Sequence, residues 1–290
     1  MPTPPVTPVS CRVDRDGVGL AVYDWGGSGA PVLLAHATGF HGRIWGPVAA
    51  RLVQAGHHVW SLDFRGHGDS DRDPGLEYHW ERNGSDVLAV VDDLQLAGHD
   101  TLGVGHSSGA TALLMAEAHR PGTFARLWCY EPIVIPSDTP LEPQPDGPLA
   151  VGARKRRAVW ESREEAQQSF GARGPFDALH PDALAAYVEY GLRERADGRF
   201  ELTCRPEDEA AVYTMQFTHR TYADLASMAC PVLVVCGAQT DAIVPKLGQK
   251  LVDRLPAGRL EVMDGLGHFG PLQDLEAASA AILRFADGST

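Results

Sequence analysis

Short apolar runs alternate with amphipathic stretches along most of the chain. Seven runs rich in aliphatic and aromatic residues have the length of β-strands: Leu20–Trp25, Val32–His36, His57–Asp63, Thr101–His106, Leu127–Glu131, Val232–Cys236 and Arg259–Met263. Between them lie five stretches that favour helices: Ile44–Ala55, Gly84–Leu96, Ser108–His119, Lys246–Leu255 and Leu272–Ala286. This alternation predicts an α/β fold, with a mostly parallel central sheet flanked by helices.

The alternation stops at about Pro132. Prolines are frequent from residue 132 to residue 148, and a basic, helix-rich stretch without strong strand signals follows as far as residue 224. The strand pattern resumes at Pro231. We therefore expect residues 1–131 and 230–290 to form the core. Residues 132–229 are expected to form a mostly helical cap, or lid, inserted between two strands of one sheet.

Charge and composition narrow the function classes. The 290 residues include 25 Lys and Arg against 38 Asp and Glu, a net charge of −13 at pH 7. Such an acidic chain binds nucleic-acid backbones and anionic membranes poorly, so neither partner is expected. Residues 1–10 lack the basic start and apolar centre of a signal peptide and predict a loose arm. Five scattered cysteines without a CxxC pair indicate reduced thiols, a cytoplasmic location and no metal site.

A pentapeptide with the pattern Gly-x-Ser-x-Gly occupies the context that a nucleophile requires. It spans Gly105–Gly109, directly after the apolar run 101–104 and directly before the small-residue helix 110–119. Flanking glycines let strand and helix pack closely while Ser107 stays exposed at the tip of the turn. The pattern predicts Ser107 as a nucleophile. The alternative is a glycine-rich connection with a solvent-facing serine.

The loop after the predicted strand Val32–His36 can supply a hydrogen-bond donor to a reacting oxygen. Acyl transfer needs two backbone N–H groups where negative charge develops. We assign one to Thr38, with Ala37 and Gly39 as rivals, and the other to Ser108. The alternative is a simple turn at a strand end.

A histidine near the C-terminus is the candidate general base. His268 lies on a glycine-flanked loop after the last predicted strand, so its ring can approach Ser107. Two carboxylates compete to hold the other ring nitrogen: Asp241 and Glu131 each follow a predicted strand. The carboxyl ends of strands are where open α/β sheets place their sites, so both candidates stand at this point.

Five stretches together resemble the α/β-hydrolase superfamily, in its serine-nucleophile branch with a helical cap. They are HATGF (36–40), LDFRGHGDSD (62–71), GHSSG (105–109), CGAQTDAIVP (236–245) and GLGHFGPL (265–272). The resemblance covers nearly the whole chain. It implies Ser107 as nucleophile, His268 as base, and an oxyanion hole formed by the backbone N–H groups of Thr38 and Ser108. It places the acid most often at the position of Asp241, which we therefore favour over Glu131.

The expected function is hydrolysis of a carboxylic ester or lactone through an acyl-enzyme, without metal or organic cofactor. The alternatives are a thioester or C–C bond hydrolase of the same fold, and a ligand receptor with little chemistry. We expect a small apolar acyl substrate, and a homodimer is compatible with the sequence. Candidate pocket residues are Ala37, Phe40, Trp45, His106, Trp160 and Phe269.

A run of four basic residues, Arg154–Arg157, stands out in this acidic chain. It could attract a carboxylate or the phosphates of an acyl-CoA to the mouth of the site. The alternative is a solvated helix face whose charges pair with Glu161, Glu164 and Glu165.

Overall fold

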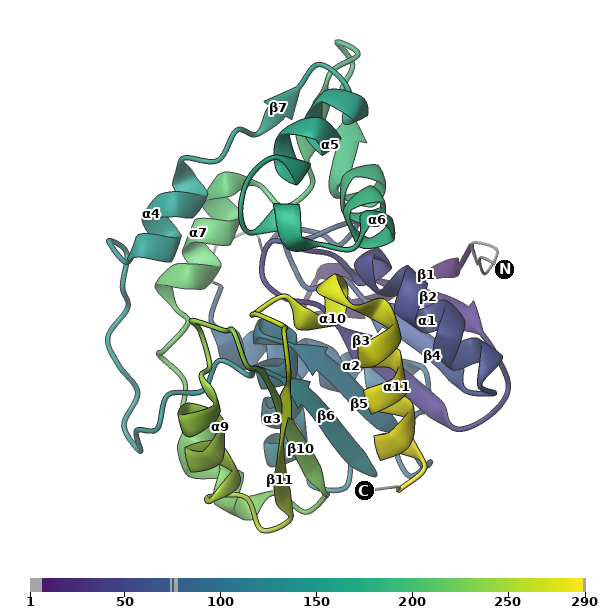
Figure 1. Ribbon diagram of the computed structural model, residues 1–290, viewed down its shortest axis with the longest axis vertical. Helices are drawn as coiled ribbons and strands as arrows, with labels where there is room; N and C mark the ends of the chain where they lie inside the picture. Colours follow the sequence, from purple (N-terminus) through teal and green to yellow (C-terminus); the bar gives the residue numbers. More distant parts are fainter. Residues whose placement is uncertain (1–6, 74, 76–77, 289–290) are drawn as a thin grey trace.

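A single eight-stranded sheet forms the centre of the computed structural model, which describes residues 7–73, 75 and 78–288 (Figure 1). The strand order is β1-β2-β4-β3-β5-β6-β10-β11. β2 runs antiparallel to both β1 and β4, and the other neighbours are parallel, which confirms the expected α/β fold. The strands are β1 (Val9–Arg15), β2 (Val18–Gly26), β3 (Pro31–Ala35), β4 (His58–Leu62), β5 (Leu102–His106), β6 (Arg126–Tyr130), β10 (Val232–Gly237) and β11 (Gly258–Met263).

The first strand differs from the expected loose arm. Val9 and Ser10 already belong to β1, which pairs with β2, while residues 1–6 lie outside the described part of the chain. Most of β1 is exposed and only Val13 is buried. Its sequence does carry the alternation of a strand, because Val9, Cys11 and Val13 are separated by single polar residues, and the expectation of a loose arm left that pattern out of account.

Helices cover both faces of the sheet, because successive strand residues point to opposite sides and are apolar on both. Val32 and Leu34 of β3 pack with α1 and α11, whereas Leu33 packs with α2, α3 and α9 on the other face. These core helices are α1 (Gly46–Gln54), α2 (Trp80–Asp93), α3 (Ser108–His119), α9 (Pro245–Val252), α10 (Gly270–Gln273) and α11 (Leu275–Ala286), with the 3-10 turn η1 (Gly42–Trp45).

The inserted segment, residues 131–231, connects β6 to β10. It contains helices and also a small sheet of order β7-β9-β8, whose strands are too short to leave a sequence pattern. Its elements are α4 (Pro148–Arg154), β7 (Val159–Trp160), α5 (Arg163–Gly171), η2 (Phe176–Ala178), α6 (Pro181–Gly191), β8 (Leu192–Glu194), β9 (Phe200–Leu202), α7 (Pro206–Thr214), α8 (Thr221–Asp224) and η3 (Leu225–Ser227).

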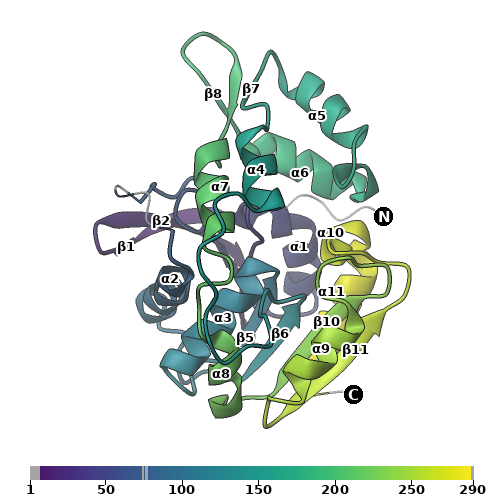
Figure 2. The ribbon, with the colours of Figure 1, turned by 90° about the vertical axis from the view of Figure 1, so that its left-hand side faces the viewer.

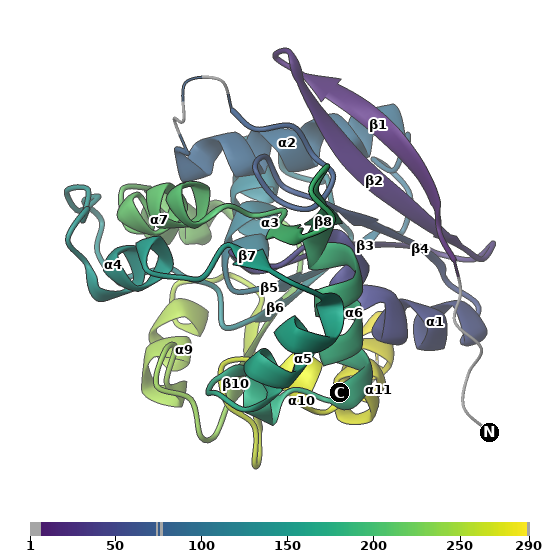
Figure 3. The ribbon, with the colours of Figure 1, turned by 90° about the horizontal axis from the view of Figure 1, so that it is seen from above.

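Two parts of the inserted segment occupy different places. Helices α4 to α7 lie above the sheet in Figure 1, and the view from above shows α4 and α7 to one side of the strands (Figures 1 and 3). In contrast, α8 packs against α3 beside the core (Figure 2). The inserted segment therefore contacts the core at more than one place. Among the described residues, no helix combines the length and apolar character needed to cross a bilayer.

Candidate active site

Ser107 occupies a sharp turn between β5 and α3. Its backbone has φ 56° and ψ −119°, a conformation that few non-glycine residues adopt. A methyl group placed on Gly105 would lie 2.4 Å from the Cα of Ala110, and one on Gly109 would lie 2.3 Å from the carbonyl oxygen of Ala35. Only glycine fits at these two positions, and their absent side chains let α3 pack tightly against the sheet while Ser107 projects from the turn.

The imidazole of His268 lies between a hydroxyl and a carboxylate. Its Nε2 is 3.2 Å from Ser107 Oγ, and its Nδ1 is 2.7 Å from Glu131 Oε2. The carboxylate can only accept, so Nδ1–H donates to Glu131 and leaves the Nε2 lone pair to accept the serine proton. The structure thus brings Ser107, His268 and Glu131 into one hydrogen-bonded line.

Glu131 is held in place by the end of β10 and by the loop that follows it. Its side chain is fully buried, and its carboxylate accepts hydrogen bonds from Gly237 N–H at 2.9 Å and from Thr240 Oγ1 at 2.7 Å. A buried carboxylate with several donors is fixed in orientation, so the ring that it holds is fixed too.

The expected position of Asp241 beside His268 is wrong. Asp241 is exposed and has no hydrogen bond or ion pair with any residue that the structure describes. Its loop instead donates to Glu131, because β6 and β10 are adjacent strands and the end of one reaches the loop after the other. A glutamate side chain is long enough to reach the imidazole from the end of β6.

The candidate oxyanion loop retains two of the three backbone N–H donors that the sequence suggested. Gly39 N–H donates to His67 Nε2 at 3.1 Å, so it is already engaged. Within the described ranges, the N–H groups of Thr38 and Ala37 have no hydrogen-bond acceptor. Ser108 begins α3, where backbone N–H groups have no partner within the helix.

Two buried histidines support this loop, and the sequence alone did not single out either of them. His36 Nε2 accepts from Phe64 N–H at 3.0 Å, so its Nδ1–H donates to Ala37 O at 2.7 Å. His67 is arranged in the same way, since its Nε2 accepts from Gly39 and its Nδ1 lies 3.0 Å from the carbonyl of Arg65. Burial lowers the pKa of each ring to about 4, so both are neutral acceptors at pH 7. The signal in the sequence that could have identified these two histidines is their position in the family-like stretches 36–40 and 62–71.

The predicted pocket residues differ in how close they lie to His268 and to the aromatic rings beside it. The ring of Phe40 lies 5.5 Å from that of Phe269, and the ring of His106 lies 5.0 Å from that of His268. Ala37 is buried in the same loop as Thr38. Trp160 joins the aromatic cluster through Phe170, whose ring is 5.1 Å away. Trp45 is a core residue and makes no ring contact with these side chains in the described ranges.

The basic run 154–157 does not act as one charged face. Arg157 pairs with Glu165 at 2.6 Å on the surface, as the solvated alternative predicts. Arg156 turns inward instead, where it donates to Glu209 and, at 2.5 Å, to the hydroxyl of Tyr187. These partners raise the pKa of Arg156 although burial opposes its charge.

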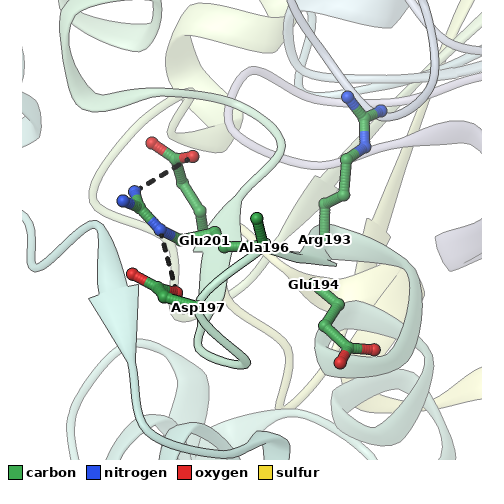
Figure 4. A pocket seen from close by; sticks show the side chains of 6 residues that line it. Arg193, Glu194, Ala196, Asp197 and Glu201 are labelled. Carbon is green, nitrogen blue, oxygen red and sulfur yellow. Dashed lines mark ion pairs between the residues drawn. The ribbon is translucent and has the colours of Figure 1, made fainter.

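Two described hollows lie elsewhere. One, of about 430 Å³, surrounds the turn between β8 and β9, where Arg195 pairs with Asp197 and Glu201, and its lining is Arg193, Glu194, Arg195, Ala196, Asp197 and Glu201 (Figure 4). The other, of about 340 Å³, is lined by residues that include His219 and Thr221. Neither lining includes a residue of the hydrogen-bonded line. In the described ranges, no three His, Cys, Asp or Glu side chains are grouped to hold a metal ion.

Comparisons with known proteins show the family and the fold of this chain. The model of the alpha/beta hydrolase family matches residues 32–281. A non-heme haloperoxidase of Rhodococcus erythropolis is 28% identical over 94% of this chain and 97% of its own length. A bifunctional esterase/perhydrolase of Acinetobacter calcoaceticus is 26% identical over 93% of this chain and 97% of its own length. The crystal structure of E-2-(acetamidomethylene)succinate hydrolase superposes with a TM-score of 0.82 at 21% identity, covering 97% of this chain and 99% of that one. The chain belongs to the alpha/beta hydrolase family.

Proposed function

We propose that the protein is a serine hydrolase that cleaves a carboxylic ester or lactone through an acyl-enzyme intermediate. The observation that carries this proposal is the hydrogen-bonded line from Ser107 through His268 to Glu131. A hydroxyl whose proton faces an imidazole, itself held by a carboxylate, is the arrangement that makes serine nucleophilic.

In the proposed reaction, Ser107 Oγ attacks the carbonyl carbon while His268 Nε2 takes the serine proton. Glu131 stabilises the resulting imidazolium and keeps the ring in the productive orientation. The tetrahedral intermediate collapses, and His268 gives its proton to the leaving alcohol. A water molecule then attacks the acyl-enzyme with the same proton transfers, releasing the acid and restoring the serine.

The negative oxygen of the intermediate needs donors on the side opposite the imidazole. We assign this role to the N–H groups of Thr38 and Ser108, since Gly39 N–H is already bonded to His67. One such donor contributes about 10²–10³ in kcat. Ala37 N–H is the remaining rival in this loop.

Among the named relatives, the esterase/perhydrolase supports an ester as the substrate. The aromatic rings of Phe40 and Phe269 beside His268 support a small apolar acyl group. The competing hypotheses are hydrolysis of a thioester, hydrolysis of a C–C bond, and ligand binding without catalysis.

The test is a parallel screen of wild type and Ser107→Ala with p-nitrophenyl acyl esters, lactones and acyl-CoAs, together with a fluorophosphonate probe. We expect a burst of p-nitrophenol from wild type, a label on Ser107, and loss of both in the variant. A wild type that neither labels nor releases product would favour the receptor. Turnover confined to acyl-CoAs would move the assignment to a thioesterase.

A further inference from the structure

Gly39 lies between the core and the inserted segment. On the core side, its N–H donates to His67. On the other side, a methyl group placed on Gly39 would lie 2.6 Å from Glu209 Oε1 and 3.4 Å from an Arg156 guanidinium nitrogen. With φ at +81°, Gly39 also has a backbone conformation that favours glycine. The loop that carries Thr38 is therefore in contact with His67 of the core on one side and with Glu209 of the inserted segment on the other.

Glu209 is buried and is held in place by its own partners. It lies in the first turn of α7 with about 5% of its surface exposed, and its carboxylate accepts from Arg156. Arg156 in turn donates to the hydroxyl of Tyr187 on α6. A buried carboxylate without its cation would be costly, so this pair fixes the carboxylate against Gly39.

The preceding residue of α7 ties the helix to the core. Asp208 is fully buried and accepts two hydrogen bonds from Arg72, at 2.7 and 2.8 Å, and one from the hydroxyl of Tyr78 at 2.9 Å. Two neighbouring acidic residues thus face different partners. Asp208 anchors α7 to the core, and Glu209 presses against the loop at Gly39.

We propose that Glu209 is a positioning residue for the oxyanion hole, because its contact with Gly39 sets the orientation of the adjacent Thr38 N–H. This inference rests on the proposed function and assigns part of its machinery to the inserted segment. Thr38 is one peptide unit from Gly39, and a backbone donor loses much of its effect when displaced by about 1 Å. Opening of the segment would then weaken the donor geometry as well as admit substrate.

The experiment compares Glu209→Ala with Glu209→Gln, whose amide oxygen can still accept from Arg156 while its amide nitrogen takes the place of Oε1 against Gly39. The matched control is Glu165→Ala, which removes the exposed partner of Arg157 in the same segment. We expect Glu209→Ala to lower kcat about tenfold, part of the 10²–10³ effect of losing a donor outright, with KM little changed. Glu209→Gln should stay within about threefold of wild type, and Glu165→Ala should match wild type.

Affinity for a boronic acid that mimics the tetrahedral intermediate separates positioning from general destabilisation. For Glu209→Ala it should fall in proportion to kcat/KM, because both depend on the oxyanion donors. A fall in melting temperature with unchanged boronate affinity would contradict the inference. So would a loss in Glu209→Gln as large as that in Glu209→Ala, since charge and not contact would then be responsible.

The steric contact itself is tested by a double-mutant cycle with Gly39→Ala. In the double variant, Glu209→Ala removes the carboxylate that the new methyl group of Gly39→Ala would otherwise meet. The loss in kcat of the double variant should therefore be smaller than the product of the two single losses. Multiplicative losses would overturn the contact.

Hydrogen exchange gives a readout that needs no turnover. Amides of residues 36–42 should exchange faster in Glu209→Ala than in wild type or Glu165→Ala, and unchanged exchange would overturn the inference. If wild type neither labels nor turns over but the exchange differs, the proposed function fails while the contact stands. If wild type turns over and Glu209→Ala equals it in every measurement, only the positioning role fails.

Discussion

His268 Nδ1 lies 2.7 Å from Glu131 Oε2, and that carboxylate comes from the end of β6, not from the loop after β10. The end of β10 and the loop after it still take part, because Gly237 and Thr240 donate to the same carboxylate. The two candidate acids therefore lie at the same end of two neighbouring strands. Glu131 holds the imidazole, and Asp241 faces solvent.

Exchange of the two carboxylates for amides should separate their roles. Glu131→Gln replaces the acceptor of the His268 Nδ1–H by a group that can favour the wrong tautomer, so kcat should fall by up to about 10⁴. Asp241→Asn should stay within a few-fold of wild type because Asp241 is exposed. Steady-state kinetics on a p-nitrophenyl ester measure both. A large loss in Asp241→Asn with a mild one in Glu131→Gln would return the acid role to residue 241.

Addition of one methyl group at the nucleophile turn should destabilise the fold. In Gly109→Ala the new carbon would lie 2.3 Å from the backbone oxygen of Ala35, which cannot move without distorting β3. We expect a loss of at least about 1–3 kcal/mol in the free energy of unfolding, measured by urea denaturation. The control is Gly152→Ala in α4, where no atom lies within 4 Å, and it should be neutral or slightly stabilising. Equal stability of the two variants would contradict the packing described for the turn.

The buried cation Arg65 should contribute far more to the free energy of unfolding than a surface arginine does. Arg65 is about 2% exposed and pairs with Asp73 at 2.7 Å and with Asp86 at 2.6 Å. Arg65→Met would leave the fully buried Asp86 uncompensated and should cost about 3–5 kcal/mol in unfolding free energy. Arg157→Met removes an exposed pair and should have little effect. Thermal and urea unfolding of both variants test this difference.

Acid should destabilise the protein through its buried histidines, of which His36 and His67 lie beside the oxyanion loop. The unfolded chain protonates its histidines near pH 6.5, whereas burial lowers the pKa of His36 and His67 to about 4 in the folded state. The unfolded state therefore binds more protons as pH falls from about 6.5 to about 4, and stability drops over that window. Burial raises the pKa of Asp63 to about 6, which works in the opposite direction. The net slope should be smaller in His67→Gln, measured by urea unfolding between pH 7.5 and 4.5. An unchanged slope would show that His67 is not buried in its neutral form.

The sequence alone predicts the order of the strands along the chain, the helices on both faces of the sheet and the turn around Ser107. These features depend on local patterns: continuous apolar runs, helical spacing and glycines beside a serine. It also determined that His268 and a carboxylate after a strand were the partners to seek. The prediction missed β1, although Val9, Cys11 and Val13 alternate with polar residues there, and it missed the short strands of the inserted segment.

Three features are visible only in the folded chain: the choice of Glu131 over Asp241, the engagement of Gly39 N–H by His67, and the approach of Glu209 to the oxyanion loop. Each of these depends on which strands are neighbours and on how side chains far apart in sequence meet. Two acidic residues that each follow a strand look alike along the chain. They differ only once β6 and β10 lie side by side, because then one carboxylate is buried among donors and the other points into water.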